Sequence, residues 1–213
     1  MSHERDDTTA LLQKADSGDQ TAVEELFSRH RARLRRMVQL RMSPILRGRV
    51  DASDVIQESF LEAWRRLDDY LKSPTMPFFL WLRFLTRQRL FAIHNRHAGV
   101  KARDPRREVA LYDGAMPEAS TEALAFQLMG KLASPSETLI RADLQLRLQE
   151  GLDALEPEER EILALRHFEQ LTSAEAAKEM HISEAAAAKR YLRALRRLKG
   201  LLVGLGFNAE ALL

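Results

Sequence analysis

Apolar side chains recur every three or four residues along most of this 213-residue chain. This spacing places them on one face of an α-helix and is typical of helices that pack against a core. The clearest run is 51–70, where Asp51 or Ser53 can cap the amino end. Its expected core face consists of Val55, Ile56, Phe60, Ala63, Trp64 and Leu67.

The same spacing predicts helices before and after this run. A short helix is expected to stop near Gly18, and Asp19 can cap the next one. The core positions of that second helix are Val23, Leu26, Phe27, Leu34, Met37 and Val38, with His30 on the same side. A long helix over 78–97 is expected to bury Phe78, Trp81, Leu82, Leu85 and Ile93. Further helices are expected over 121–129, from 136 to about 155, from 157 onward, over 173–180 and over 184–199. The helix that starts at 157 is expected to bury Ile162, Leu163, Leu165 and Phe168.

Composition changes between these helices. Residues 101–107 are basic and broken by proline, and 108–137 then carry five acids and one base. Changes of this kind mark domain boundaries. We therefore expect an all-α chain of two small helical domains, 1–98 and 136–213, joined by a flexible linker over 99–135. A short apolar tail, 204–213, follows the last expected helix.

Several classes of function are disfavoured by composition. The chain has no cysteine, which excludes disulfides and thiolate zinc sites and fits a reducing compartment. The first seven residues are polar, and no uncharged apolar run approaches the roughly 20 residues of a membrane span, so a cytoplasmic protein without membrane insertion is expected. No glycine-rich phosphate loop or nucleophile–base signature is found, and His94-x-x-His97 lacks a third metal ligand. We expect no enzyme activity, no cofactor and no metal.

Charge divides the helix at 51–70 into two sides. Asp54, Glu58 and Glu62 are spaced four residues apart, with Gln57 and Leu61 beside them. Like charges at this spacing cost a few tenths of a kcal/mol. On its own this side is most simply a solvated face, but it also suits a basic partner.

Arginine is concentrated in two places. Residues 29–49 contain eight arginines and no acid, and 78–97 interleave arginine with phenylalanine and tryptophan. Arginine next to aromatic rings suits single-stranded nucleic acid, where bases stack and phosphates are neutralised. Any amphipathic helix with arginines outside has the same composition, so both interpretations stay open at this point.

The segment 173–199 has the pattern of a helix–turn–helix. Ala176 and Ala177 leave room for a crossing helix, His181 stands where the turn needs a left-handed residue, and Ser183 can cap the second helix. Residues 184–199 carry six Lys or Arg and one acid. The alternative is a basic amphipathic helix in an ordinary bundle.

These motifs together resemble a known family. Asp54-Val-Ile-Gln-Glu-Ser-Phe-Leu61 is similar to D-x-x-Q-E-x-F-L, and Phe78-x-x-Trp81-Leu82 is similar to F-x-x-W-L. Leu155-x-Pro157-x-x-Arg160-Glu161, Glu175-Ala-Ala177 and Arg193-Ala194 follow in the second half. The set resembles regions 2 and 4 of the extracytoplasmic-function (ECF) sigma factors, the smallest class of bacterial sigma-70-type initiation factors, over about 18–97 and 144–202. The chain departs from the family pattern at Gln88, Ala92, His181 and 186–188.

The resemblance implies binding to core RNA polymerase, through the clamp helices of the β′ subunit and also the β subunit. The residues that it places at this contact are Asp54, Gln57, Glu58, Leu61 and Glu62. An anti-sigma factor is a further partner that it implies. Polymerase would perform all the chemistry.

The resemblance also implies that promoter DNA is opened at the −10 element and read at the −35 element. The residues expected at the separated strand are Lys72, Arg83, Arg87, Gln88, Arg89 and Arg96. Those expected at the −35 duplex are Ser183, Glu184, Ala185, Ala186, Lys189, Arg190, Arg193 and Arg197. Alanine can touch thymine methyl groups but cannot hydrogen-bond bases, so phosphate contacts and DNA shape are expected to carry much of this recognition.

Two other functions fit parts of the pattern. A helix–turn–helix regulator could bind DNA without polymerase, and a scaffold could use the helical faces without any DNA. The acidic side of 51–70 distinguishes a sigma factor from such a regulator, because only the sigma factor needs it to bind polymerase. The basic helix at 184–199 distinguishes a sigma factor from such a scaffold, because the scaffold binds no DNA.

Overall fold

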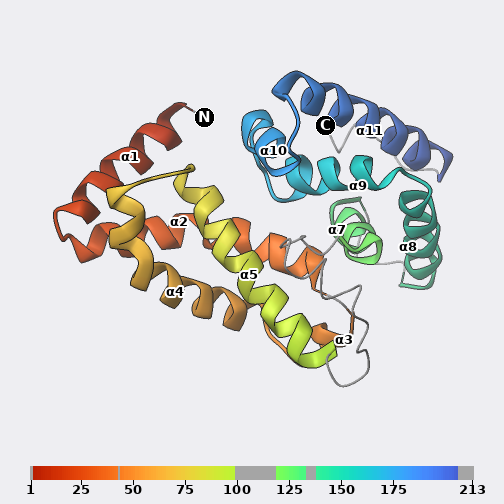
Figure 1. The fold of residues 1–213 in the computed structure, drawn as a ribbon. Coiled ribbons are helices and arrows are strands. Elements are labelled where there is room, and N and C mark those ends of the chain that lie inside the picture. Colours follow the sequence, from red (N-terminus) through yellow and green to blue (C-terminus); the bar gives the residue numbers. More distant parts are fainter. Residues whose placement is uncertain (1, 43, 99–118, 133–137, 206–213) are drawn as a thin grey trace, which may run out of the picture. The chain divides into compact units, whose positions relative to one another are not determined.

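The computed structural model describes residues 2–42, 44–98, 119–132 and 138–205, and Figure 1 shows their course. All regular structure within these ranges is helical, as the apolar spacing predicts. The chain divides into two compact units, one formed by 1–38 with 42–116 and the other by 39–41 with 117–213. The prediction of an all-α chain with two small helical domains is confirmed.

The predicted linker and tail are largely outside the described residues. These exclude 99–118 and 133–135 of the linker, 136–137 directly after it and 206–213 of the tail. The described part of the linker contains α7, Thr121–Leu132, which runs three residues beyond the predicted end at 129. The domain boundaries at 98 and 135 stay a prediction.

The first unit is built from α1 to α5. Their bounds are Ser2–Asp16 for α1, Gln20–Arg41 for α2, Pro44–Arg47 for α3, Ala52–Lys72 for α4 and Phe78–Ala98 for α5. Asp19 caps α2 as predicted, because its side chain accepts hydrogen bonds from the backbone N–H groups of Thr21 and Ala22 at 2.9 and 3.3 Å. Helix α3 is a single turn where only a connector is predicted.

Stacked aromatic rings form the core of this unit. Phe27 of α2 lies 4.8 Å from Phe60 of α4 and 6.4 Å from Phe78 of α5, measured between ring centroids. Tyr70 and Trp81 join α4 to α5 in the same way, with centroids 4.5 Å apart. Offset ring pairs of this kind stabilise by about 0.5–1.5 kcal/mol beyond their buried area. The apolar positions predicted for α2 and α5, together with His30, are all buried.

Trp64 is an exception to the predicted core. It is 45% exposed, and its ring centroid lies 6.4 Å from that of Phe27 in an edge-on arrangement. The buried residues of α4 centre on Ser59 and Ala63, and Trp64 lies about 100° from that centre on the helix. It therefore borders the core and faces solvent. The prediction that it belongs to the buried stripe is wrong.

The second unit contains α7 to α11. Beyond α7, their bounds are Thr138–Asp153 for α8, Pro157–Leu163 for α9, Ser173–Glu179 for α10 and Glu184–Gly204 for α11. Helix α11 packs against α8, α9 and α10, and α7 packs against α8 (Figure 1). The residues predicted as the core of the helix that starts at 157 are all buried.

That helix does not end as a regular α-helix. Residues Ala164–Phe168 form a π-helical turn, in which the Glu169 N–H donates to the Ala164 carbonyl at 2.8 Å. Gln170 then adopts a left-handed φ of 60° and ends the turn.

Helices α8 and α11 approach closely at a glycine. A Cβ atom built on Gly151 would lie 2.1 Å from a methyl group of Leu201. Gly200 is also helical, but a Cβ there would meet nothing within 4 Å. The two glycines therefore have different physical roles, although both lie in helices.

We predict opposite effects of alanine at these two positions. Gly151→Ala should lower the thermal midpoint of unfolding, because the cost of displacing Leu201, about 1–3 kcal/mol, exceeds the helix gain of alanine, about 1 kcal/mol. Gly200→Ala should raise it, because alanine is about 1 kcal/mol more favourable than glycine in a helix. Thermal unfolding followed by circular dichroism measures both, and equal shifts of the same sign would contradict the close approach.

Candidate functional site

Helix α4 begins at a well-defined cap. The side chain of Asp51 accepts a hydrogen bond from the Ser53 N–H at 2.7 Å, which confirms one of the two predicted caps. That bond lowers the pKa of Asp51 below its usual range. The cap fixes the start of α4 and hence the direction of the side chains in its first turns.

The residues predicted to contact polymerase lie on the side of α4 away from the aromatic core. Asp54, Gln57, Glu58 and Leu61 are exposed, and Glu62 is partly exposed. Leu61 is 56% exposed, as the sequence predicts. The structure therefore brings all of these side chains to one surface, which joins acids with an apolar side chain.

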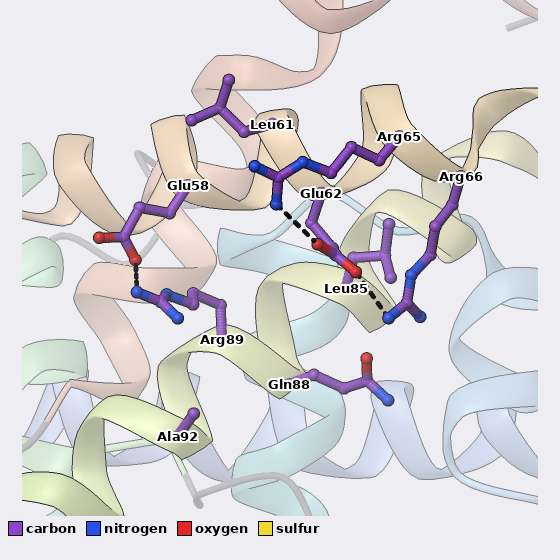
Figure 2. A pocket seen from close by; sticks show the side chains of 9 residues that line it. All are labelled: Glu58, Leu61, Glu62, Arg65, Arg66, Leu85, Gln88, Arg89 and Ala92. Atoms are coloured by element: carbon purple, nitrogen blue, oxygen red, sulfur yellow. Dashed lines mark ion pairs between the residues drawn. The ribbon is translucent and has the colours of Figure 1, made fainter.

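A groove of about 390 Å³ runs between α4 and α5 (Figure 2). Its lining is contributed by both helices and combines apolar side chains with both signs of charge. The lining residues are Glu58, Leu61, Glu62, Arg65, Arg66, Leu85, Gln88, Arg89 and Ala92. Residues predicted for polymerase and residues predicted for DNA therefore share one groove.

Two sets of ion pairs cross or border this groove. Glu58 of α4 pairs with Arg89 of α5, and Glu62 pairs with Arg66 at 2.6 Å and with Arg65 at 3.6 Å (Figure 2). The exposed fractions of these side chains lie between 32% and 74%. Exposed pairs of this kind contribute about 0–1 kcal/mol each, so they can be exchanged for other partners at little cost.

Helix α5 presents most of its predicted strand-binding residues to solvent. Gln88 and Arg96 are exposed, and Arg87 and Arg89 are partly exposed. The guanidinium of Arg87 lies over the ring of Phe84 at 5.2 Å. This contact holds a cation next to an aromatic face, which is the combination that suits a nucleotide.

Arg83 differs from the prediction, because it is 1% exposed. All six residues from Phe78 to Arg83 are buried, so the first part of α5 has no solvent-facing side. The sequence interpretation assumed that every arginine of this helix lies outside. Arg83 is therefore removed from the candidate strand-binding surface.

The loop between α4 and α5 is held in place by a hydrogen bond. The Tyr70 hydroxyl donates to the Met76 carbonyl at 2.9 Å. Burial raises the pKa of Tyr70 to about 12, so the donor keeps its proton at neutral pH. Lys72, the last residue of α4, is exposed directly before this loop. The end of α4 thus presents one predicted strand-binding cation.

Some arginines of the 29–49 run are engaged with the core. The guanidinium of Arg33 lies 3.5 Å from the centroid of Phe79, and that of Arg31 lies 5.3 Å from Phe60. Arg29 instead forms an exposed pair with Glu25 at 2.6 Å. The contacts of Arg33 and Arg31 support the simpler interpretation, in which long cationic side chains cover apolar surface.

The second candidate surface is the helix–turn–helix of α10 and α11. Thr172 caps α10 in a reciprocal arrangement, in which its side chain accepts from the Glu175 N–H at 3.1 Å and the Glu175 carboxylate accepts from the Thr172 N–H at 2.8 Å. Ala176 and Ala177 are buried. The small residues predicted for the helix crossing are therefore in the expected place.

The turn has the predicted left-handed residue. His181 has a φ of 53°, and Ser183 accepts a hydrogen bond from the Ala186 N–H at 3.2 Å as the cap of α11. Arg166 from the π-helical turn lies over the Tyr191 ring at 5.1 Å, which ties α11 to the segment that follows α9. These contacts orient the exposed side of α11.

Helix α11 exposes most of its predicted DNA-binding residues. Ser183, Glu184, Ala185, Lys189, Arg193 and Arg197 are exposed, whereas Ala186 and Arg190 are partly exposed. Arg197 also pairs with Glu159 at 2.8 Å, and the Glu159 side chain is 4% exposed. Since a buried carboxylate without its partner is costly, Arg197 has a structural role as well.

The sequence interpretation missed three exposed residues on the same side of α11. These are Leu192, Arg196 and Lys199. Leu192 and Arg196 follow Lys189 by three and seven residues, so extending the helical spacing from Lys189 would have found them.

Other kinds of site find no support in the described parts of the chain. Among these residues, no group of three or more His, Asp or Glu is placed to hold a metal ion. No described helix has the length and apolar character needed to cross a membrane.

Comparison with known proteins agrees with this arrangement. The family model described as Sigma-70 region 2 matches residues 26–96, and the one described as Sigma-70, region 4 matches residues 145–198. The chain is 29% identical over 197 residues to the ECF RNA polymerase sigma factor SigD of Mycobacterium bovis, with 92% of this chain and 84% of that protein covered. The SigD protein of Mycobacterium tuberculosis matches with the same identity and coverage.

A solved structure has a similar fold. It is the structure of CnrH in complex with the cytosolic domain of CnrY, and the match covers 93% of this chain and 98% of that chain. The TM-score is 0.52 at 23% identity.

The matched regions coincide with the two candidate surfaces. The region 2 match contains α4 and most of α5, which line the groove, and the region 4 match contains α10 and most of α11. The chain therefore belongs to the sigma-70 family, in its extracytoplasmic-function class.

Proposed function

We propose that this chain directs core RNA polymerase to promoters, binding the enzyme through α4, the separated −10 strand through α5 and the −35 duplex through α11. One observation carries the proposal. The outer side of α4 joins exposed acids to an exposed leucine, directly beside an arginine-bearing helix. Single exposed leucines are common on protein surfaces, but Leu61 also lines the groove together with Leu85 of α5, so the acids border a shared apolar surface.

The polymerase contact combines charge with burial. Asp54 and Gln57 are exposed in the first turns of α4, and Leu61 lies one turn later on the same side. An apolar anchor surrounded by polar side chains is the usual anatomy of a protein interface. Such a surface suits a basic partner, and the resemblance implies that this partner is the clamp helices of the β′ subunit.

The ion pair between Glu58 and Arg89 links the two binding events. When a basic polymerase side chain approaches Glu58, it competes with Arg89 for the same carboxylate. Arg89 is then available for a phosphate of the separated strand. Exposed Gln88 and Arg96, partly exposed Arg87 and exposed Lys72 complete the strand surface.

The −35 element is bound by the exposed side of α11. Lys189 and Arg193 neutralise phosphates, and the turn with His181 presents the first turn of the helix to the major groove. Such a factor acts in the cytoplasm, where polymerase and DNA are, and leaves the chemistry to the polymerase. An anti-sigma factor is the kind of protein regulator that the resemblance implies for these surfaces.

Charge reversal on α4 tests the polymerase contact. Asp54→Lys should weaken binding to core RNA polymerase by about 2–3 kcal/mol, roughly 30- to 150-fold, because it places like charges against each other. The measurement is equilibrium binding of labelled full-length chain to core polymerase, with circular dichroism to confirm folding.

Asp68→Lys is the matched control for this experiment. Asp68 is an exposed acid on the same side of α4, about 21 Å further along. Its reversal should leave the affinity for polymerase nearly unchanged. Unchanged binding by Asp54→Lys would contradict the proposed contact. Binding of duplex DNA without any binding of polymerase by the unaltered chain would favour a regulator that acts alone.

A double-mutant cycle tests whether the pair of Glu58 and Arg89 is exchangeable. Glu58→Gln, Arg89→Gln and the double variant should give a coupling energy for unfolding below about 1 kcal/mol, because the pair is largely exposed. Arg89→Gln should nevertheless weaken promoter opening by the holoenzyme, measured with a fluorescent base in the −10 element. A coupling energy above about 2 kcal/mol would show that the pair is a fixed structural link.

The salt dependence of promoter binding tests the phosphate contacts of α11. Lys189→Ala and Arg193→Ala should each make the slope of log K against log salt shallower by about 1, because one fewer counterion is released. Lys14→Ala, an exposed residue of α1, makes the same charge change elsewhere and should leave the slope unchanged. An unchanged slope in both α11 variants would place the DNA elsewhere.

A further inference from the structure

Leu192 is a large apolar side chain on the exposed side of α11. It is 52% exposed and lies about two turns after Glu184, the first residue of the helix. The buried side of α11 is formed by Ala187, Ala194, Leu198 and Leu202. Leu192 points away from these residues on the helix, so the core does not require a leucine at this position.

The surroundings of Leu192 are cationic. Helical spacing aligns it with Ala185, Lys189 and Arg196, all of them exposed, and Arg193 follows directly. Single exposed leucines are common on protein surfaces. This one is distinguished by its place in the middle of a basic row on the second helix of a helix–turn–helix, where the proposed function places DNA.

The chemistry of that row limits what it can read. Ala185 and Leu192 form no hydrogen bonds with their side chains, and Lys189 and Arg196 are cations that also suit phosphates. The Ser183 side chain already accepts the capping hydrogen bond from Ala186. The row can therefore read a base pair in two ways: Lys189 and Arg196 can donate to guanine, and Ala185 and Leu192 can make apolar contacts.

Only one apolar group marks a base pair in the major groove, and it is the C5-methyl group of thymine. We propose that Leu192 is a specificity-determining residue that packs against the C5-methyl group of a thymine in the −35 element. The proposal rests on the proposed role of α11 in −35 binding. Lys189 and Arg196, on either side, hold the helix at the depth in the groove where this contact forms.

Uracil substitution isolates the methyl group. A promoter is first selected by the holoenzyme from a randomised duplex library, and each thymine of its −35 element is then replaced singly by deoxyuridine. This change removes one methyl group and keeps every hydrogen-bonding group of the base pair. The holoenzyme of the unaltered chain should bind one of these duplexes about fourfold more weakly, the effect expected for one buried methyl group.

Variants assign that effect to Leu192. Leu192→Ala should bind the thymine and uracil duplexes with nearly equal affinity, and Leu192→Met should retain most of the discrimination because it keeps an apolar side chain of similar volume. Val203→Ala is the matched control. Val203 is 59% exposed on the same side of α11, about 16 Å further along, and its loss should leave the uracil profile unchanged.

Each other outcome overturns the proposal in a recognisable way. Equal sensitivity to uracil in the unaltered chain and in Leu192→Ala would remove Leu192 from recognition, and so would a flat uracil profile in a holoenzyme that binds its promoter tightly. Weaker binding of Leu192→Ala to core polymerase, with an unchanged uracil profile, would assign the side chain to a protein contact. If the unaltered holoenzyme selects no sequence from the library, the proposed function itself fails.

Discussion

The stacking of Phe27 between Phe60 and Phe78 determines the geometry of the first unit. One ring of α2 contacts a ring of α4 at 4.8 Å and a ring of α5 at 6.4 Å. Because planar rings pack in few ways, this contact sets both the distance and the rotation of α4 and α5 relative to each other. The groove, its mixed charges and the exposed side of α4 all depend on that rotation. A second aromatic contact, between Tyr70 and Trp81, reinforces it at the loop.

In the second unit, small residues determine how closely the helices pack. Ala176, Ala177 and Gly151 let helices approach closely, so that α11 is held firmly while its outer side stays free. Capping at Thr172 and Ser183 fixes where the two helices of the motif begin. Rigid placement matters because a helix that reads a major groove must enter it at a defined angle.

Much of this could be predicted from the sequence because the signals are local. The caps at Asp19, Asp51 and Ser183 and the left-handed turn residue His181 follow from the chemistry of single residues and their neighbours. The burial of Trp81 follows from helical spacing.

The failures have a common physical cause. Spacing gives the direction of a side chain but not how far neighbouring elements extend around the helix, so Trp64 was expected inside and Arg83 outside. The pair of Glu58 and Arg89 joins residues 31 positions apart, and it depends on the rotation of two helices that no local signal encodes.

That ion pair has a thermodynamic consequence for the proposed function. If polymerase binding withdraws Glu58 from Arg89, then the two ligands of the first unit are coupled through one carboxylate, and such coupling is reciprocal. DNA that captures Arg89 raises the affinity of α4 for polymerase by the same factor by which polymerase raises the affinity of α5 for DNA. Promoter binding would then raise the affinity of the factor for polymerase, and loss of the strand after initiation would lower it.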